Sequence, residues 1–254
     1  MLLATLVVTP GRAHATITGV LPVLEPMLAS TEAIAAPVDD WAFEPKLDGW
    51  RALVYVDGDV TVRTRTGRDV TVSLPELAPL VDALAGRSVV LHGELVARQG
   101  RSWDFYRLGP RLNAHRPETV ARGQVRTPVT LAIFDVIVLD GRDITATPYV
   151  ERRRLLEGLA LNGPAWCTVS SFAGFGPELF AAVHELGLAG VVAKRLDSSY
   201  RPGTRSRDWV KAKTTTWRTE HAPRRLSERA RSASYPGAAA SRASTGARRV
   251  SRLR

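Results

Sequence analysis

The hydrophobic and polar positions along the chain predict a protein built largely from β-strands. Seven runs are rich in β-branched and aromatic residues or are continuously apolar, and each predicts a strand: residues 41–44, 51–56, 60–65, 88–96, 130–139, 191–194 and 209–213. The tripeptide Asp57-Gly58-Asp59 separates the second run from the third and predicts a tight hairpin turn. Asp140-Gly141 predicts another turn directly after the fifth run.

Helical patterning is confined to a few short segments. Residues 77–84 predict one or two helical turns, and residues 148–161 and 177–186 predict longer helices that each begin with a proline. Strands joined by hairpin turns and interrupted by few helices are typical of an α+β fold and not of a doubly wound parallel sheet. No internal repeat is visible, so the predicted fold class is α+β.

Charge divides the chain into a nearly neutral body and a basic end. The 254 residues carry a net charge of +10, from 35 basic and 25 acidic side chains. Residues 218–254 hold ten arginines and two glutamates, a net of +8, which leaves +2 for the first 217 residues. We expect this end to be a disordered tail that contacts nucleic acid through phosphates; a frame-shifted or decayed C-terminus is the alternative. Residues 21–217 are predicted to form one compact unit, preceded by a disordered extension at 1–20.

Several classes of protein and site are disfavoured. The single cysteine, Cys167, cannot form an internal disulfide and suits a reducing compartment. No apolar run approaches the roughly 20 residues that span a bilayer, and the opening MLLATLVVTPGRAHA lacks the positively charged start of a signal peptide. The sequence contains no GxxxxGK[ST], GxGxxG or GxSxG motif, and its five histidines lack metal-ligand spacing. We therefore expect a cytoplasmic protein with no membrane contact.

Lysine is scarce in this chain. Of the 35 basic residues only four are lysines: Lys46, Lys194, Lys211 and Lys213. Arginine stays protonated in proteins, whereas a lysine amine that is desolvated or crowded by cations can lose its proton and become a nucleophile. GC-rich coding also favours arginine, so the scarcity of lysine does not by itself identify a nucleophile. Lys46 is the strongest of them, because it stands in the charged string EPKLDGWR at residues 44–51.

The string KLDGWR, residues 46–51, resembles the nucleophile motif KxDGxR of covalent nucleotidyltransferases: ATP-dependent DNA ligases, RNA ligases and messenger-RNA capping enzymes. Taken alone, it could be a charged turn between strands. Five further segments resemble the remaining motifs in the family's order: TRTGRD at 64–69, HGEL at 92–95, IFDV at 133–136, GVVAK at 190–194 and WVKAK at 209–213. The link RLDSSYRPGTRSRDW and the start LEPMLAS are similar to bacterial DNA ligases of the repair and end-joining type. The resemblance covers about residues 21–217.

This resemblance implies a DNA ligase adenylation domain, in which antiparallel sheets hold the nucleotide in a groove between them. It implies that Lys46 attacks the α-phosphate of ATP and carries AMP, which passes to the 5′-phosphate of nicked double-stranded DNA before the 3′-hydroxyl seals the nick. Asp48, Lys211 and Lys213 would assist catalysis, and Asp48 and Glu94 are candidates to hold Mg²⁺ or Mn²⁺. The nucleotide-binding residues that it implies are Glu44, Arg51, Arg65, Glu94, Phe134, Lys194, Lys211 and Lys213. A nucleoid-associated monomer is the expected form.

Each of these residues also has a structural interpretation. Glu94 could be a solvated carboxylate at a strand end, Phe134 a core residue and Lys194 a surface residue. Lys211 and Lys213 are one strand period apart and share a face, which could be a solvated one. The ordered set of motifs favours the nucleotide site.

The chain departs from the family's pattern in two places. The fourth motif of ligases begins with glutamate, as in EGVVAK, where this chain has Ala189; Glu185 lies four residues upstream and could compensate. Ligases of this type also continue into an OB-fold, and the 37 residues that follow Trp217 do not have the composition of a barrel. Three alternatives therefore stay open: an RNA ligase or capping-type nucleotidyltransferase, an inactive ATP-binding relic, and a nucleic-acid-binding module without a nucleotide site.

Overall fold

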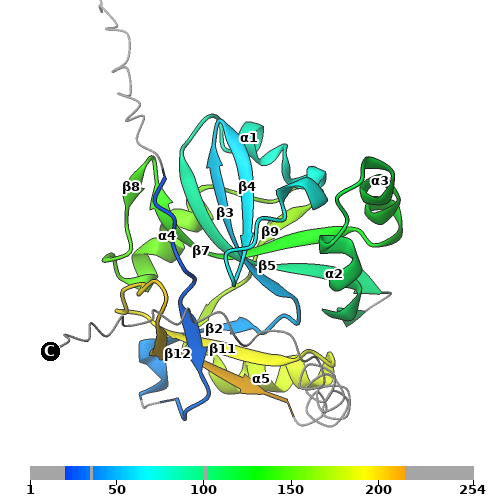
Figure 1. The fold of residues 1–254 in the computed structure, drawn as a ribbon. Helices are drawn as coiled ribbons and strands as arrows, with labels where there is room; N and C mark the ends of the chain where they lie inside the picture. The colour runs from blue at the N-terminus through cyan, green and yellow to red at the C-terminus, as the bar shows by residue number, and fades with distance from the viewer. Residues whose placement is uncertain (1–20, 35–36, 100–101, 104, 215–254) are drawn as a thin grey trace, which may run out of the picture. The chain divides into compact units, whose positions relative to one another are not determined.

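Two β-sheets form the centre of the fold (Figure 1). The computed structural model describes residues 21–34, 37–99, 102–103 and 105–214, which belong to one compact unit. The larger sheet has the strand order β4-β3-β5-β7-β8, with β6 pairing with β5 and β9 with β7. The smaller sheet has the order β1-β12-β11-β2-β10. Strand pairing is antiparallel except between β1 and β12 and between β7 and β9.

The larger sheet contains the predicted hairpin and the two predicted buried strands. β3 (Trp50–Asp57) and β4 (Asp59–Thr64) pair up to Asp57 and Asp59, and Gly58 closes the turn with a φ of +73°, which glycine adopts without strain. The other strands of this sheet are β5 (Val89–Gln99), β6 (Ser102–Trp103), β7 (Val129–Leu139), β8 (Arg142–Asp143) and β9 (Trp166–Thr168). The core of this sheet is formed by apolar side chains such as Val54, Leu91 and Ile133.

The smaller sheet consists of β1 (Leu28–Ser30), β2 (Trp41–Pro45), β10 (Phe172–Ala173), β11 (Gly190–Arg195) and β12 (Arg205–Lys213). Phe43, Val191 and Val183 join in one buried cluster, which packs the sheet against helix α5 (Gly176–Glu185). β12 begins four residues before the predicted strand at 209–213, because Arg205 already pairs with β1. The opposite face, which carries Glu44 and Val192, lines a pocket together with strands of the larger sheet.

The helices are α1 (Leu80–Ala83), α2 (Phe105–Leu112), α3 (Pro117–Arg126), α4 (Tyr149–Gly158) and α5, with 3₁₀ turns at Val38–Asp40, Thr71–Ser73 and Pro75–Leu77. α4 packs against β7, and it confirms the helix predicted at 148–161, as α5 confirms the one at 177–186. The segment 77–84 is the end of a 3₁₀ turn followed by the single turn of α1. The sequence does not predict α2 and α3, because Gly109-Pro110 and Gly123 interrupt their helical patterns.

The α+β fold class and all seven predicted strands are confirmed. The sequence does not predict β1, β6, β8, β9 and β10, which have only two or three residues each and depend on pairing with longer strands. The predicted segments at 1–20 and 218–254 lie outside the described residues, so those boundaries stay predictions. Within the residues that the structure describes, no helix is both long and apolar enough to cross a membrane.

Candidate active site

A pocket lined by strands of both sheets gathers most of the predicted site residues. Seven of the ten line it: Glu44, Lys46, Arg51, Glu94, Phe134, Lys194 and Lys211. The rest of the lining is apolar or aromatic: Ala29, Pro45, Leu47, Val169, Val192 and Trp209. An apolar pocket with a few convergent polar groups is typical of a small-molecule site.

The register of the smaller sheet explains why residues far apart in the sequence meet in this pocket. Glu44 of β2 lies opposite Val192 of β11, which lies opposite Lys211 of β12. Side chains at opposite positions of neighbouring strands project from the same face of a sheet. Lys194 and Trp209 form a second opposed pair two residues along the same strands. All five residues line the pocket as a result.

The larger sheet contributes the opposite wall. Arg51 of β3 lies opposite Glu94 of β5, and both side chains line the pocket. β7 carries one extra residue here, because Gly93 pairs with Ile133 whereas the preceding residue of β5 pairs with Asp135. Phe134 is the bulged residue, and a β-bulge re-aims the side chain that it carries. The bulge turns Phe134 toward the pocket.

The loop that carries Lys46 is held against both sheets. The backbone N–H of Lys46 donates a hydrogen bond to the carbonyl oxygen of Gly190 at 2.7 Å. The backbone N–H of Gly49 donates to Glu94 Oε1 at 3.3 Å. A Cβ atom at Gly49 would lie 2.2 Å from the carbonyl oxygen of Leu95, so this position of KLDGWR requires glycine. The motif's glycine therefore has a structural reason.

Positive charges converge at one end of the pocket. Burial lowers the pKa of the Lys211 amine, and the positive charges of Arg205, Arg51, Lys46 and Arg65 lower it further. The amine of Lys46 donates to the carbonyl oxygen of its neighbour Leu47 at 2.9 Å and is partly exposed. Like charges this close repel one another, and a bound anion relieves the repulsion. This cationic end suits phosphate groups.

Two carboxylates adjoin the cations. Burial raises the pKa of the Glu94 carboxyl; the positive charges of Arg51 and Lys46 and the N–H of Gly49 oppose this rise, and the negative charge of Asp48 adds to it. Arg51 Nε lies 4.0 Å from Glu94 Oε2. The described residues contain no group of three or more His, Cys, Asp or Glu side chains able to hold a metal ion by themselves. Two adjacent carboxylates still fit Mg²⁺, which usually takes one or two carboxylates together with substrate phosphate oxygens.

The other end of the pocket is a buried ion pair enclosed by rings. Lys194 Nζ donates to Glu44 Oε1 and lies 2.9 Å from each carboxylate oxygen, and it also donates to the carbonyl oxygen of Phe134 at 2.9 Å. The ring centroids of Phe134, Tyr149 and Trp209 lie 4.5, 4.9 and 4.4 Å from Nζ. Burial lowers the pKa of Lys194, and the negative charge of Glu44 opposes that shift. Lys194 is 1% exposed, so its interpretation as a surface residue is wrong.

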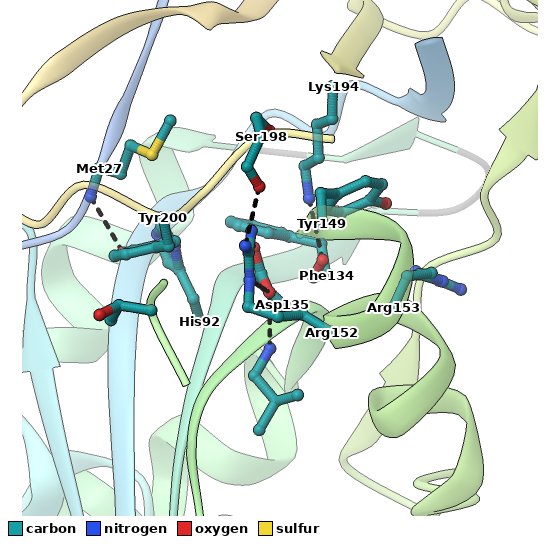
Figure 2. A network of polar contacts seen from close by, with 12 residues as sticks. Met27, His92, Phe134, Asp135, Tyr149, Arg152, Arg153, Lys194, Ser198 and Tyr200 are labelled. Atoms are coloured by element: carbon teal, nitrogen blue, oxygen red, sulfur yellow. Dashed lines mark hydrogen bonds and ion pairs between the residues drawn. The ribbon is translucent and has the colours of Figure 1, made fainter. Parts of the chain in front are cut away.

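A second buried network lies beneath this pair (Figure 2). Arg152 donates to both carboxylate oxygens of Asp135, at 3.0 and 2.9 Å, and to the carbonyl oxygen of Ser198 at 3.1 Å. The hydroxyl of Tyr200 lies 3.0 Å from Nδ1 of His92, whose ring packs against Phe134. Burial and neighbouring positive charges lower the pKa of His92 well below its ordinary value. The loop between β11 and β12 is thereby tied to helix α4 and to β7.

Three predicted residues do not line the pocket: Asp48, Arg65 and Lys213. Asp48 lies close enough to Glu94 to affect its pKa. Arg65 has an exposed side chain, and its backbone N–H donates to the carbonyl oxygen of Arg51 at 2.9 Å. Lys213 follows Lys211 by one strand period on β12. All three are therefore flanking positions.

Sequence reasoning does not single out Tyr149, although its hydroxyl donates a hydrogen bond to Glu44 Oε1 at 2.5 Å. The only signal is its place after Pro148, at the start of a predicted helix. Glu94 is partly buried, with a side chain 15% exposed, and is not a solvated carboxylate at a strand end. Phe134 both packs against the buried rings of His92 and Trp209 and lines the pocket.

Comparison with known proteins agrees with this geometry. A family model described as the ATP dependent DNA ligase domain matches residues 26–213. The multifunctional non-homologous end joining DNA repair protein LigD of Mycobacterium tuberculosis is 40% identical over 199 residues, which are 78% of this chain and 24% of that protein. A DNA ligase of Thermococcus onnurineus is 35% identical over 205 residues, 76% of this chain and 36% of the relative. This chain thus spans about a quarter to a third of the length of these relatives.

Solved structures give the same result. The ligase domain of M. tuberculosis LigD superposes with a TM-score of 0.64 at 40% identity, over 75% of this chain and 60% of that one. The Chlorella virus DNA ligase-adenylate, at 15% identity and a TM-score of 0.52 over 76% and 69% of the two chains, shares the fold. The predicted nucleotidyltransferase fold, with antiparallel sheets on either side of a pocket, is confirmed. The chain belongs to the ATP-dependent DNA ligase domain family.

Proposed function

We propose that the chain is the adenylation module of an ATP-dependent DNA ligase and that Lys46 is its nucleophile. The observation that supports this most is that the two ends of the pocket differ in chemistry: one is cationic, and the other is aromatic with a carboxylate. Lys46, Arg51 and Lys211 bring positive charge to one end, and Phe134 and Glu44 bring a ring and a carboxylate to the other. A nucleoside triphosphate has matching ends, because its phosphates are anionic and its base is aromatic and polar.

ATP would enter with its base between the sheets. The ring of Phe134 would stack on adenine. An ionised carboxylate can only accept hydrogen bonds, so Glu44 would accept one from the 6-amino group of the base. Lys194 would hold Glu44 in place, while Arg51 and Glu94 would contact the ribose. This orientation leaves the triphosphate at the cationic end beside Lys46.

The proposed reaction is nucleotidyl transfer to nitrogen. Lys46 loses a proton to become a neutral amine and attacks the α-phosphorus of ATP. A nitrogen–phosphorus bond forms, the bond from the α-phosphorus to the bridging oxygen breaks, pyrophosphate leaves, and a second proton leaves the nitrogen. Lys211 and Lys213, with Arg65, would stabilise negative charge on the phosphates in the transition state.

Asp48 and Glu94 are the residues proposed to hold a divalent ion, Mg²⁺ or Mn²⁺. Such an ion would neutralise phosphate charge and polarise the phosphoryl oxygens. The protein's own part is to keep two carboxylates beside the cations, where the pKa of Glu94 responds to both Asp48 and Lys46. Asp48 could also orient the amine of Lys46.

The later steps act on DNA. AMP would pass from Lys46 to the 5′-phosphate at a nick in double-stranded DNA, and the 3′-hydroxyl would displace AMP to seal the strand. The names of the relatives support this substrate, because one is a DNA ligase and another a DNA repair protein of end joining. We propose a monomer that acts in the cytoplasm, near the nucleoid, with its basic C-terminal segment contacting nucleic acid.

One feature favours an inactive nucleotide-binding protein as the second candidate. Ala189 stands where the family's fourth motif has glutamate, and its side chain is buried, with 4% exposure. Glu185 ends helix α5 with an exposed side chain and is not among the residues that line the pocket. Compensation by Glu185 therefore has no support, and the strength of metal binding depends on Asp48 and Glu94.

Strand sealing by the full 254-residue chain tests the proposal. We would incubate it with ATP, Mg²⁺ and a duplex that carries a labelled 5′-phosphate at a nick, beside Lys46→Ala and beside a duplex with an RNA nick. Sealed DNA with the wild type, none with Lys46→Ala and less sealed RNA are the expected results. Bound ATP without sealing or an adduct would favour the inactive candidate, and preferential sealing of RNA would favour an RNA ligase. Ala189→Glu would then show whether the missing carboxylate is the cause.

A further inference from the structure

Helix α4 begins behind the pocket lining, where its first residue contacts Glu44, a residue that lines the pocket. Pro148 precedes its first residue, Tyr149, whose backbone N–H donates to the carbonyl oxygen of Ser198 at 2.8 Å. The next N–H, that of Val150, donates to the carbonyl oxygen of Leu196 at 2.9 Å. The loop after β11 therefore fixes the start of α4. These two hydrogen bonds fix the backbone position of Tyr149, and with it the position from which its side chain extends.

The hydroxyl of Tyr149 reaches the carboxylate that we assign to the base. It donates to Glu44 Oε1 at 2.5 Å, and Tyr149 is fully buried. Burial and the negative charge of Glu44 raise the pKa of Tyr149 well above its ordinary value, so the hydroxyl keeps its proton and remains a donor. Ser171 Oγ lies 3.2 Å from the same hydroxyl on its other side. Among the described residues, Glu44 is therefore the charged acceptor of the Tyr149 hydroxyl.

Three groups thus face Glu44 from two elements. Lys194 of β11 lies 2.9 Å from each carboxylate oxygen, and Tyr149 of α4 binds Oε1. Arg153, one helical turn after Tyr149, brings Nη1 to 3.8 Å from Oε1, which is a charge contact beyond hydrogen-bond distance. A carboxylate has about four lone-pair sites, so acceptor capacity remains for a ligand. Which lone pairs of Glu44 remain for a ligand, and where they point, depends on which ones Lys194 and Tyr149 occupy.

We propose that Tyr149 is a positioning residue for nucleotide recognition: its hydroxyl holds the Glu44 carboxylate so that it accepts from a 6-amino purine and disfavours a 6-oxo purine. The proposal rests on the proposed function, because it requires that the base lies at this end of the pocket. The 6-oxo group of inosine can only accept hydrogen bonds and would face an acceptor-only carboxylate. Tyr149 touches neither base nor phosphate in this assignment, and it acts through Glu44.

Titration of ATP and of inosine triphosphate into the full chain tests this assignment without requiring catalysis. Tyr149→Phe removes only the hydroxyl, and Tyr55→Phe is the matched control, because the hydroxyl of Tyr55 is bound to the backbone of Leu24, away from the pocket lining. We expect Tyr149→Phe to reduce the preference for ATP over inosine triphosphate by about tenfold, the size of a hydrogen bond to a charged group. Tyr55→Phe should leave that preference unchanged.

A second comparison guards against a merely structural effect. In a Glu44→Gln background, Tyr149→Phe should change the ATP preference by less than about twofold, because interacting residues are not additive. An equal loss of affinity for both nucleotides, or an unchanged preference, would overturn the role of Tyr149 and leave the nucleotide site intact. A wild-type chain that binds neither nucleotide would overturn the proposed function as well. Thermal melting of each variant checks that it is folded.

Discussion

The two ends of the pocket are built on opposite electrostatic principles. At the base end, Glu44 and Lys194 neutralise each other in a buried pair, and rings enclose the amine. At the phosphate end, Lys46 and Lys211 are partly exposed and of like charge, with Arg51 close enough to lower the pKa of Lys211. The base end is therefore organised before a ligand binds. At the phosphate end the cations repel one another, and a bound anion would reduce that repulsion.

This difference separates recognition from chemistry. A buried, hydrogen-bonded carboxylate is rigid and can read the shape and polarity of a base at little cost in reorganisation. Crowded cations favour the neutral form of a lysine amine and stabilise charge on a phosphate. The same lysine-to-methionine substitution should therefore mainly lower stability at the base end and mainly slow the reaction at the phosphate end.

The largest expected contrast is in stability. Lys194→Met should lower the free energy of unfolding by about 3–5 kcal/mol, because it leaves the Glu44 carboxylate buried without its hydrogen-bonded cation. Lys211→Met removes one of several like charges from a partly exposed site, so stability should change by less than about 1 kcal/mol. Urea unfolding of both variants at pH 7 measures the contrast. Equal losses at the two sites would contradict the account of the two ends.

The next contrast is in rate. Lys211→Met should slow adenylation at saturating ATP by about 100-fold, because it removes a charge that would stabilise the transferring phosphate. Single-turnover formation of labelled protein measures this rate, and Lys211→Arg, which keeps the charge, should retain most of it. A rate for Lys211→Met within about threefold of the wild type would remove Lys211 from the catalytic group.

The smallest effect concerns His92 beneath the base end. Its folded-state pKa lies well below the ordinary 6.5, so below pH 6.5 the unfolded chain binds a proton that the folded chain does not. The contribution of His92 to the free energy of unfolding is therefore fully present above pH 6.5. It falls by about 1.4 kcal/mol per pH unit as the pH drops from 6.5 toward the pKa of the folded state. Urea unfolding at pH 7.0 and 5.5 measures the loss, which His92→Gln should lack. The same acid dependence in both proteins would refute it.

Much of this site could be predicted from the sequence because its motifs are local. KLDGWR and WVKAK each place functional residues within a single loop or strand, and seven of the ten predicted residues line one pocket. The partners of these residues could not be predicted in the same way. Tyr149 meets Glu44 across 105 positions of sequence, and the bulge that turns Phe134 depends on strand pairing.

The fold shows the same division. Periodicity predicts the long strands and the helices α4 and α5, because their patterns are continuous over several residues. The helices α2 and α3 are not predicted, because their glycine and proline residues have low helix propensity. Tertiary packing stabilises both helices nonetheless. Short strands such as β1 and β10 exist only because a longer strand offers an edge, and no local pattern carries that information.

Covalent labelling tests the central claim most directly. The full chain would be incubated with Mg²⁺ and ATP carrying a radioactive α-phosphate, denatured and separated from free nucleotide, beside Lys46→Ala and Lys46→Arg. Arginine keeps the positive charge but cannot supply a neutral amine, so Lys46→Arg should still bind ATP and carry no label. We expect label to stay on the wild type alone, with one pyrophosphate released for each AMP attached to Lys46. Label that persists in Lys46→Arg, or a wild type that binds ATP and stays unlabelled, would contradict it.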